Sequence, residues 1–187
     1  PHPMGAASHS WQPYRGRVGL VYASNQPSGI GNKSDRFLRY STDKGVTWSA
    51  RVTVNDDVNT QNNQQFFPAI WNDQKTGKLY IKWYDTRNCS TSDSMDVYAT
   101  YTADGGQTFA QNQRITNQLF KIKLSSSGGA PAYQGDYDAI MSNGKVSVPT
   151  WTDFRYNNYT SMIAYFPDFG MRLNPTVDSL NNTVGNV

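Results

Sequence analysis

The stretch Ser41-Thr42-Asp43-Lys44-Gly45-Val46-Thr47-Trp48 decides the fold, because the chain contains a second copy of it. The second copy, at 102–109, keeps Asp, Gly, Thr and an aromatic residue at the same spacing, about sixty residues further on. A third and weaker copy is found at 162–170. Recurrence of one motif at a nearly constant interval predicts a repeat architecture.

The chemistry of this motif predicts a tight turn that stabilises the fold rather than a catalytic site. An aspartate side chain accepts backbone N–H groups across such a turn, glycine adopts positive φ without steric cost, and a large ring packs between the flanking strands. The residues assigned this structural role are Ser41, Asp43, Gly45, Thr47 and Trp48 in the first copy and Thr102, Asp104, Gly106, Thr108 and Phe109 in the second.

A second motif, W-x-D-x-R, repeats in phase with the first at 83–87 and 151–155. Each copy follows a segment in which apolar and polar residues alternate, the period of a strand with one buried face. The two copies, 78–87 and 145–155, align if one extra residue is allowed before the second Trp. With the Gly-containing turns at 75–77, 104–106 and 142–144, each unit is predicted to be a four-stranded antiparallel meander. Stacking of such sheets around an axis buries both of their faces, as in a β-propeller.

The two motifs together resemble the Asp-box (BNR) repeat of sialidase-like β-propellers. The resemblance covers residues of about 10–172 and implies an all-β fold with four-stranded antiparallel blades at about 1–58, 64–118 and 130–173. Residues 174–187 are expected to be an exit linker or the start of a β-sandwich domain. Three blades make about half of a probable six-bladed ring, so the remainder of the propeller or another chain is expected to close it.

The sialidase resemblance also implies three arginines for a substrate carboxylate, a Tyr/Glu nucleophile pair and an Asp acid/base. The sequence contains no Glu, and the N-terminal Arg-Ile-Pro signature of sialidases is absent. A Tyr/Glu pair therefore cannot be built from this chain alone, so no catalytic residue is assigned, and whether the protein is an enzyme stays open.

Two interpretations remain for the W-x-D-x-R motifs. Arg87 and Arg155 either belong to an anion-binding cluster, because guanidinium groups bind carboxylates, or form repeated structural ion pairs with Asp85 and Asp153. The residues predicted for ligand binding are Arg87, Arg155, Asp85 and Asp153 with the aromatic residues Tyr84 and Tyr156. Trp71 and Tyr159 are further aromatic residues suited to stacking on sugar rings.

The sequence patterns for metal binding, disulfide formation and glycosylation are weaker than the two repeated motifs. Oxygen-rich loops at 54–59 and 135–138 are compatible with Ca²⁺, but neither matches a defined calcium loop, so no metal or cofactor is assigned. Cys89 is the only cysteine, which excludes an intrachain disulfide. The N-x-[ST] pattern marks Asn32, Asn88, Asn158 and Asn181 as glycosylation candidates.

The amino-acid composition limits the classes of partner and the cellular locations to be considered. Charged residues make up only 17% of the chain and the net charge is +3, which does not indicate a nucleic-acid partner. No apolar run is long enough to span a membrane. We expect a secreted or cell-surface module that binds glycans or assembles extracellularly. The alternative is part of an exo-sialidase or related glycoside hydrolase whose catalytic residues lie partly outside this segment.

Overall fold

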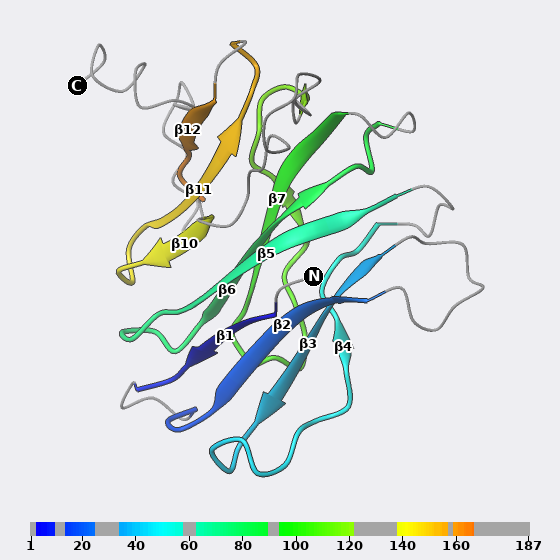
Figure 1. Ribbon diagram of the computed structural model, residues 1–187. Helices are drawn as coiled ribbons and strands as arrows, with labels where there is room; N and C mark the ends of the chain where they lie inside the picture. Colours follow the sequence, from blue (N-terminus) through cyan, green and yellow to red (C-terminus); the bar gives the residue numbers. More distant parts are fainter. Residues whose placement is uncertain are drawn as a thin grey trace, which may run out of the picture.

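The computed structural model describes residues 3–9, 14–24, 34–57, 63–89, 94–121, 138–156 and 159–166, and these residues form three antiparallel β-sheets (Figure 1). The first sheet contains β1 (Met4–Ala7), β2 (Val18–Ser24), β3 (Asp35–Ser41) and β4 (Val52–Thr53). The second contains β5 (Gln65–Asn72), β6 (Leu79–Asp85), β7 (Ser94–Thr102) and β8 (Gln113–Arg114), with β9 (Phe120–Lys121) paired to β7. The third contains β10 (Ala139–Ser142), β11 (Ser147–Asp153) and β12 (Thr160–Ile163).

This architecture confirms the predicted all-β, blade-like fold. Apart from β9, which pairs with β7, the strands follow one another in the order of the sequence within each sheet, and the first strands β1 and β10 both contact β5. The third sheet has three strands within the described residues; the last part of its predicted blade, 167–173, lies outside them, as does the predicted exit linker 174–187. The described part of the chain contains no helix suited to crossing a membrane.

The two copies of the W-x-D-x-R motif occupy the same place in their strands. Trp83 is the fifth residue of β6 and Trp151 is the fifth residue of β11, and both strands have seven residues. The extra residue that the alignment allows before the second Trp lies ahead of the strand, because Lys78 directly precedes β6 whereas Val146 stands between Lys145 and β11.

Burial along the strands shows how the sheets pack. Every residue of β6 is buried, whereas buried and half-buried residues alternate along β11. One apolar cluster lies between the first and second sheets and includes Val21, Leu38 and Trp83. Another lies between the second and third sheets and includes Tyr80 and Trp151. The middle sheet is thus covered on both faces, which removes the alternation that marks a half-buried strand.

The first aspartate turn, at 41–48, has the predicted hydrogen bonds. Asp43 accepts the Thr47 backbone N–H at 2.8 Å and the Thr47 hydroxyl at 2.5 Å. The Ser41 hydroxyl donates to Asp43 at 2.7 Å and accepts the Gly45 N–H at 2.7 Å. Gly45 has a φ of 94°, a value that glycine adopts without steric cost.

The second aspartate turn, at 102–109, repeats this arrangement. The Thr108 backbone N–H and hydroxyl donate to Asp104 at 3.0 and 2.6 Å, and the Thr102 hydroxyl donates to it at 2.7 Å. The Gly106 N–H donates to Thr102 Oγ1 at 3.0 Å, and its φ is 104°. Phe109 packs against the apolar cluster between the first two sheets.

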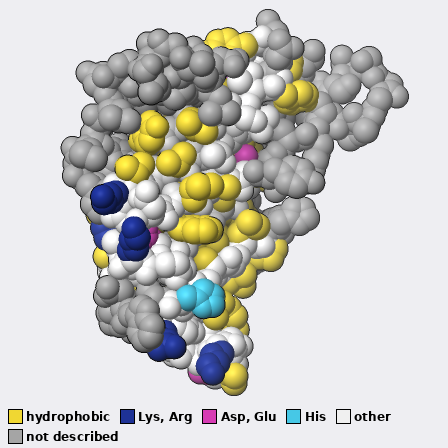
Figure 2. Space-filling model, turned by 90° about the vertical axis from the view of Figure 1, so that its left-hand side faces the viewer, with side chains coloured by type: hydrophobic (Ala, Val, Ile, Leu, Met, Phe, Trp, Pro, Cys, Tyr) yellow, Lys and Arg dark blue, Asp and Glu magenta, His cyan; other side chains and the backbone are white. Residues whose placement is uncertain are grey.

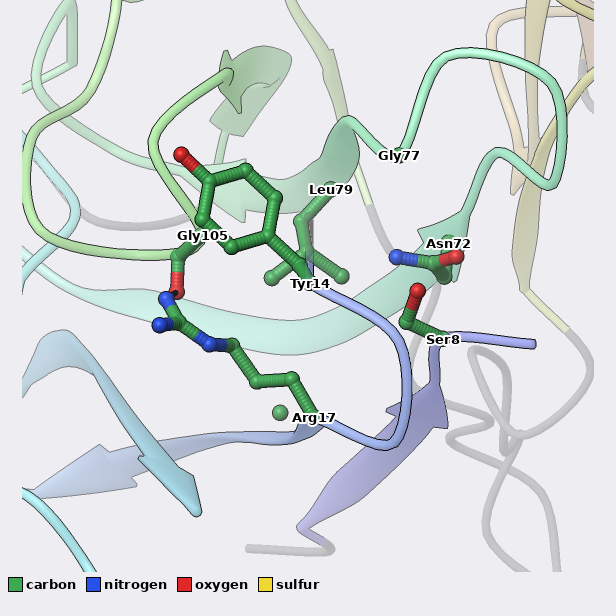
Figure 3. Close-up of a pocket in the computed structure, with 8 residues that line it drawn as sticks. Ser8, Tyr14, Arg17, Asn72, Gly77, Leu79 and Gly105 are labelled. Carbon is green, nitrogen blue, oxygen red and sulfur yellow. Dashed lines mark hydrogen bonds between the residues drawn. The ribbon is translucent and has the colours of Figure 1, made fainter. Parts of the chain in front are cut away.

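Arg17 joins the second aspartate turn to the first sheet. Its guanidinium lies between the rings of Tyr14 and Tyr40, at 4.6 and 4.5 Å from their centroids. Its Nη1 donates to the carbonyl oxygens of Asp104 and Gly105. Figure 3 shows this side chain pointing toward Gly105 beside a small cavity, which is also lined by Ser8, Asn72 and Leu79. The turn is thereby held against the neighbouring sheet.

The aspartate turns lead us to expect a loss of stability in acid. Hydrogen bonds from Thr47 lower the pKa of Asp43 to about 2. For Asp104, burial would raise the pKa, but the hydrogen bonds from Thr108 outweigh it and lower the pKa. Because both values lie below those of the unfolded chain, this stabilisation is present above about pH 4 and disappears as the pH falls through the folded values. Urea unfolding should show the midpoint falling between about pH 4 and pH 2.

The variant Asp104→Asn tests this assignment. It should be less stable than the wild type at pH 7 and should lose less stability between about pH 4 and pH 2. An equally steep decline in the variant would show that other carboxylates cause the acid sensitivity.

Candidate functional site

The ends of the long strands bring most of the predicted ligand-binding residues to one side of the sheets, which we name the strand-end face. It consists of the residues that precede β5 and β10 and those that follow β6 and β11. The antiparallel register places the start of β5 beside the end of β6, with Gln65 opposite Asp85. In the next sheet Asp138 immediately precedes β10, and the β11 strand ends at Asp153.

Each W-x-D-x-R motif forms a closed set of hydrogen bonds around its aspartate. Asp85 Oδ2 accepts the Trp83 indole N–H at 2.8 Å and the Arg87 Nε–H at 2.9 Å. In the third sheet, Asp153 Oδ2 accepts Trp151 Nε1–H at 3.3 Å and Arg155 Nε–H at 2.7 Å. Both aspartates are fully buried. The motif thus ties a core tryptophan to a guanidinium at the strand end.

The Arg87 guanidinium is engaged by further acidic groups from the first sheet's exit segment. Its Nη1 donates to Asp56 at 2.8 Å, and its Nη2 lies 3.7 Å from Asp57. Nη2 also donates to Asn112 at 3.2 Å, and the group lies over the Tyr98 ring. Burial alone would lower the Arg87 pKa, but the aspartates outweigh it and raise the pKa. This geometry favours the structural interpretation of Arg87 over binding of an external anion.

Arg155 has a similar but smaller set of contacts. Besides Asp153, its Nη1 donates to Asn117 at 2.7 Å, so it links the third sheet to the end of the second. Its side chain is almost wholly buried. Each guanidinium is thus held by the aspartate of its own motif and also by a residue from the segment that follows or connects strands of a neighbouring sheet, Asp56 for Arg87 and Asn117 for Arg155.

Sequence reasoning missed a buried charged cluster between the second and third sheets. The ammonium of Lys82 lies 2.8 Å from Asp138 Oδ2, and the Tyr84 hydroxyl donates to Asp138 Oδ1 at 3.1 Å. Burial lowers the pKa of Lys82 to about 8 despite the opposing charge of Asp138. Burial likewise raises the pKa of Asp138, against the effect of Lys82. A lysine within the apolar run 79–84 was the available signal, because a charge at such a position requires a partner.

Tyr84 was predicted as a ligand-binding aromatic, and the structure corrects this prediction. Its side chain is fully buried, its ring stacks on Phe66, and its hydroxyl accepts the Thr152 N–H at 3.1 Å. Burial and the charge of Asp138 raise its pKa well above the usual value. Tyr84 therefore belongs to the core between two sheets and offers no surface to a sugar.

Exposed aromatic side chains are instead found on the connection between β11 and β12. Tyr156 is 52% exposed and Tyr159 is 48% exposed, whereas the neighbouring Arg155 is buried. The ring of Tyr159 packs edge-on against Phe154, with 5.1 Å between their centroids. The predicted residue Tyr156 thus lies at the surface of the strand-end face, with Tyr159 on the same connection.

In the oxygen-rich loop 54–59, of which the structure describes residues 54–57, the side-chain oxygens are engaged by protein contacts. Asp57 accepts amide N–H groups from Asn55, Asn63 and Gln65 at 2.7, 3.0 and 3.1 Å. Among the residues that the structure describes, no three His, Cys, Asp or Glu side chains are arranged to hold a metal ion. Most of the second predicted calcium loop, 135–137, lies outside those residues.

One glycosylation candidate can be placed. The Asn88 Nδ2, which would carry the glycan, donates to Asp96 and to the Tyr98 hydroxyl, both at 2.8 Å. These bonds disfavour glycosylation of Asn88 in the folded protein. The candidates Asn32, Asn158 and Asn181 lie outside the described residues.

Comparison with known proteins supports the fold. No protein-family model matches the chain, and no curated protein matches its sequence. The solved structure of the Hadza microbial sialidase Hz136 is similar, with a TM-score of 0.61 and 20% identity over 90% of this chain and 35% of that chain. Zg3597, a family 117 glycoside hydrolase of the marine bacterium Zobellia galactanivorans, is similar with a TM-score of 0.53 and 12% identity, over 97% of this chain and 55% of that chain. The chain therefore spans about a third to a half of these proteins, and at such identities the likeness shows the fold alone.

Proposed function

We propose that the chain is a segment of a secreted or cell-surface β-propeller that binds glycans at the strand-end face. The observation that supports this proposal is the exposure of the Tyr156 and Tyr159 rings on the connection that follows the buried Asp153–Arg155 ion pair. An aromatic ring fixed at a surface offers a flat apolar area to the C–H groups of a sugar ring at little entropic cost. The remaining blades of the ring come from outside residues 1–187.

The charged groups argue for binding rather than hydrolysis by this segment. Arg87 and Arg155 are held by aspartates, Tyr84 is buried with a raised pKa, and the sequence contains no Glu. The second candidate function is part of an exo-sialidase or related glycoside hydrolase. It is favoured by the similarity of 90% of the chain to a sialidase structure.

A glycan array with the purified chain tests the binding proposal. We expect a subset of glycans to bind, and we expect Tyr156→Ala and Tyr159→Ala each to weaken that binding by about tenfold, because each removes a stacking surface. Val46→Ala is the matched control, since Val46 is an exposed apolar side chain in the first aspartate turn. Equal binding by the tyrosine variants and the wild type would contradict the assignment of the site.

A fluorogenic sialoside distinguishes the two candidates. The binding proposal expects no turnover by the chain alone. Turnover above background that Asp85→Asn and Asp153→Asn abolish, in variants shown by circular dichroism to be folded, would establish the hydrolase candidate instead.

A further inference from the structure

The small cavity between the first and second sheets lies at the opposite end of the strands from the strand-end face. Its walls come from the end of β1, the segment 14–19, the end of β5, the start of β6 and the second aspartate turn. Figure 3 shows Arg17 along one side of the cavity, with Ser8 and Asn72 along another. The side of the molecule seen in Figure 2 carries a band of hydrophobic side chains at its surface, whereas this cavity brings polar groups together between two sheets.

The size of the cavity limits what it can hold. Its volume is about 10 Å³. A single buried water molecule needs roughly 10–15 Å³ for its centre on the same measure. A sugar ring or a side chain of a partner protein is much larger than this space. The occupant is therefore a single water molecule or an ion of about the same size.

Arg17, which lines the cavity, has one donor without a partner in the protein. Its Nη1 donates to the carbonyl oxygens of Asp104 and Gly105, and its guanidinium lies between the rings of Tyr14 and Tyr40. The Nε of the same group is buried and has no hydrogen-bond partner among the described residues. A buried N–H of a charged group is costly when it has no acceptor. Because the guanidinium is fixed by its other contacts, Nε requires an acceptor that comes to it.

The other side of the cavity supplies oxygen atoms that accept hydrogen bonds. The Asn72 side chain is buried, and its Oδ1 accepts a hydrogen bond from Gln74 Nε2 at 3.3 Å. An amide oxygen has a second lone pair, and a hydroxyl oxygen such as that of Ser8 also accepts. In Figure 3 the Ser8 hydroxyl points toward the Asn72 amide.

These groups together select the chemistry of the occupant. It must accept the N–H of Arg17 and donate to an oxygen atom. A halide ion accepts but cannot donate, and a metal cation cannot accept and is repelled by the guanidinium. Water does both, and buried water molecules in proteins pair with polar groups that have no other partner.

We propose that this cavity is a binding site for one ordered water molecule, which accepts the Arg17 Nε–H and donates to Asn72 Oδ1 or Ser8 Oγ. The water links the ends of β1 and β5 to the side chain that holds the second aspartate turn. Part of the contact between the first and second sheets is thus mediated by water, which bonds nearly as well as a direct partner. The proposal does not depend on glycan binding at the strand-end face.

A high-resolution crystal structure of the chain, from crystals soaked in sodium bromide, tests the site. We expect a water peak within hydrogen-bond distance of Arg17 Nε and of Asn72 Oδ1 or Ser8 Oγ, without anomalous signal from bromide. An anomalous peak in the cavity would show an anion site and overturn the proposal. So would a cavity without electron density, or an Arg17 Nε that donates directly to the protein.

Oxygen-17 magnetic relaxation dispersion tests the same site in solution, because it counts internal water molecules with long residence times. Arg17→Lys keeps the positive charge but removes the Nε–H, so this variant should hold one long-lived water fewer than the wild type. Arg39→Lys is the matched control, since Arg39 is exposed on β3, and it should leave the count unchanged. An unchanged count in a folded Arg17→Lys variant, or an equal loss in the control, would overturn the proposal.

Discussion

Replacing Asp138 with alanine is expected to lower the free energy of unfolding by about 3–5 kcal/mol, because it leaves the Lys82 ammonium buried without its carboxylate. The two charged groups are 2.8 Å apart, and their side chains are 0% and 4% exposed, so water cannot replace the lost partner. The substitution also removes one of the two acceptors available to the Tyr84 hydroxyl, the other being the Thr152 carbonyl oxygen at 3.0 Å. Urea denaturation at pH 7, followed by tryptophan fluorescence, measures the change.

Two controls identify the cause of this loss. In the double variant Lys82→Met with Asp138→Ala, no charge is left unpaired, and most of the stability should return. Raising the pH should also reduce the loss of stability in the single variant Asp138→Ala. The pKa of Lys82 is already lowered to about 8 in the wild type, and loss of Asp138 removes an interaction that raises it. The folded variant then holds a neutral lysine at pH values below about 8, where the folded wild type and the unfolded chain still hold the proton, so its stability deficit shrinks as the pH rises toward about 8 and stays constant above that value. A deficit independent of pH would show that the unpaired charge is not responsible.

Replacing Gly106 with alanine is expected to cost about 2–4 kcal/mol, from backbone strain and overpacking together. Gly106 has a φ of 104°, which is unfavourable for any residue with a β-carbon. A β-carbon at this position would also lie 2.6 Å from Leu38 Cδ2 and 3.1 Å from Tyr40 Cδ1. Leu38 is fully buried between the first two sheets, so it has little room to move. Thermal and urea unfolding measure the loss.

Gly45 provides the matched control, because it occupies the same place in the first aspartate turn. Its φ is 94°, but the nearest atom to an added β-carbon is Trp48 Cζ2 at 3.9 Å, an ordinary contact. Gly45→Ala should therefore cost only the backbone strain, about 1–3 kcal/mol. Equal losses at the two glycines would show that the second turn does not press against the first sheet.

Local sequence was enough to predict the aspartate turns. The hydrogen bonds of Asp43 and Asp104 join residues no more than four apart, so residue types and spacing specify them. The strand order also followed from the sequence, because alternating segments separated by short turns pair with their neighbours. The repeat then predicted the number of sheets.

The candidate sites depended on contacts that the sequence does not reveal. Tyr84 and Tyr156 each follow a tryptophan or arginine of a W-x-D-x-R motif, yet one is buried and the other is half exposed. Their exposure depends on whether a neighbouring sheet covers them. Asp85 could be read from the motif as a partner of Arg87, but Asp56, which follows the first sheet in the chain, could not.

By itself, the sequence determined the turns, the strands and their repetition, because these depend on backbone conformations and hydrogen bonds within a few residues. Only the tertiary structure decided that Lys82 is paired with Asp138, that Arg87 also binds Asp56, and that Tyr84 is buried whereas Tyr156 is exposed. These features are set by the packing of one sheet on the next, and packing energies depend on contacts between residues far apart in the chain.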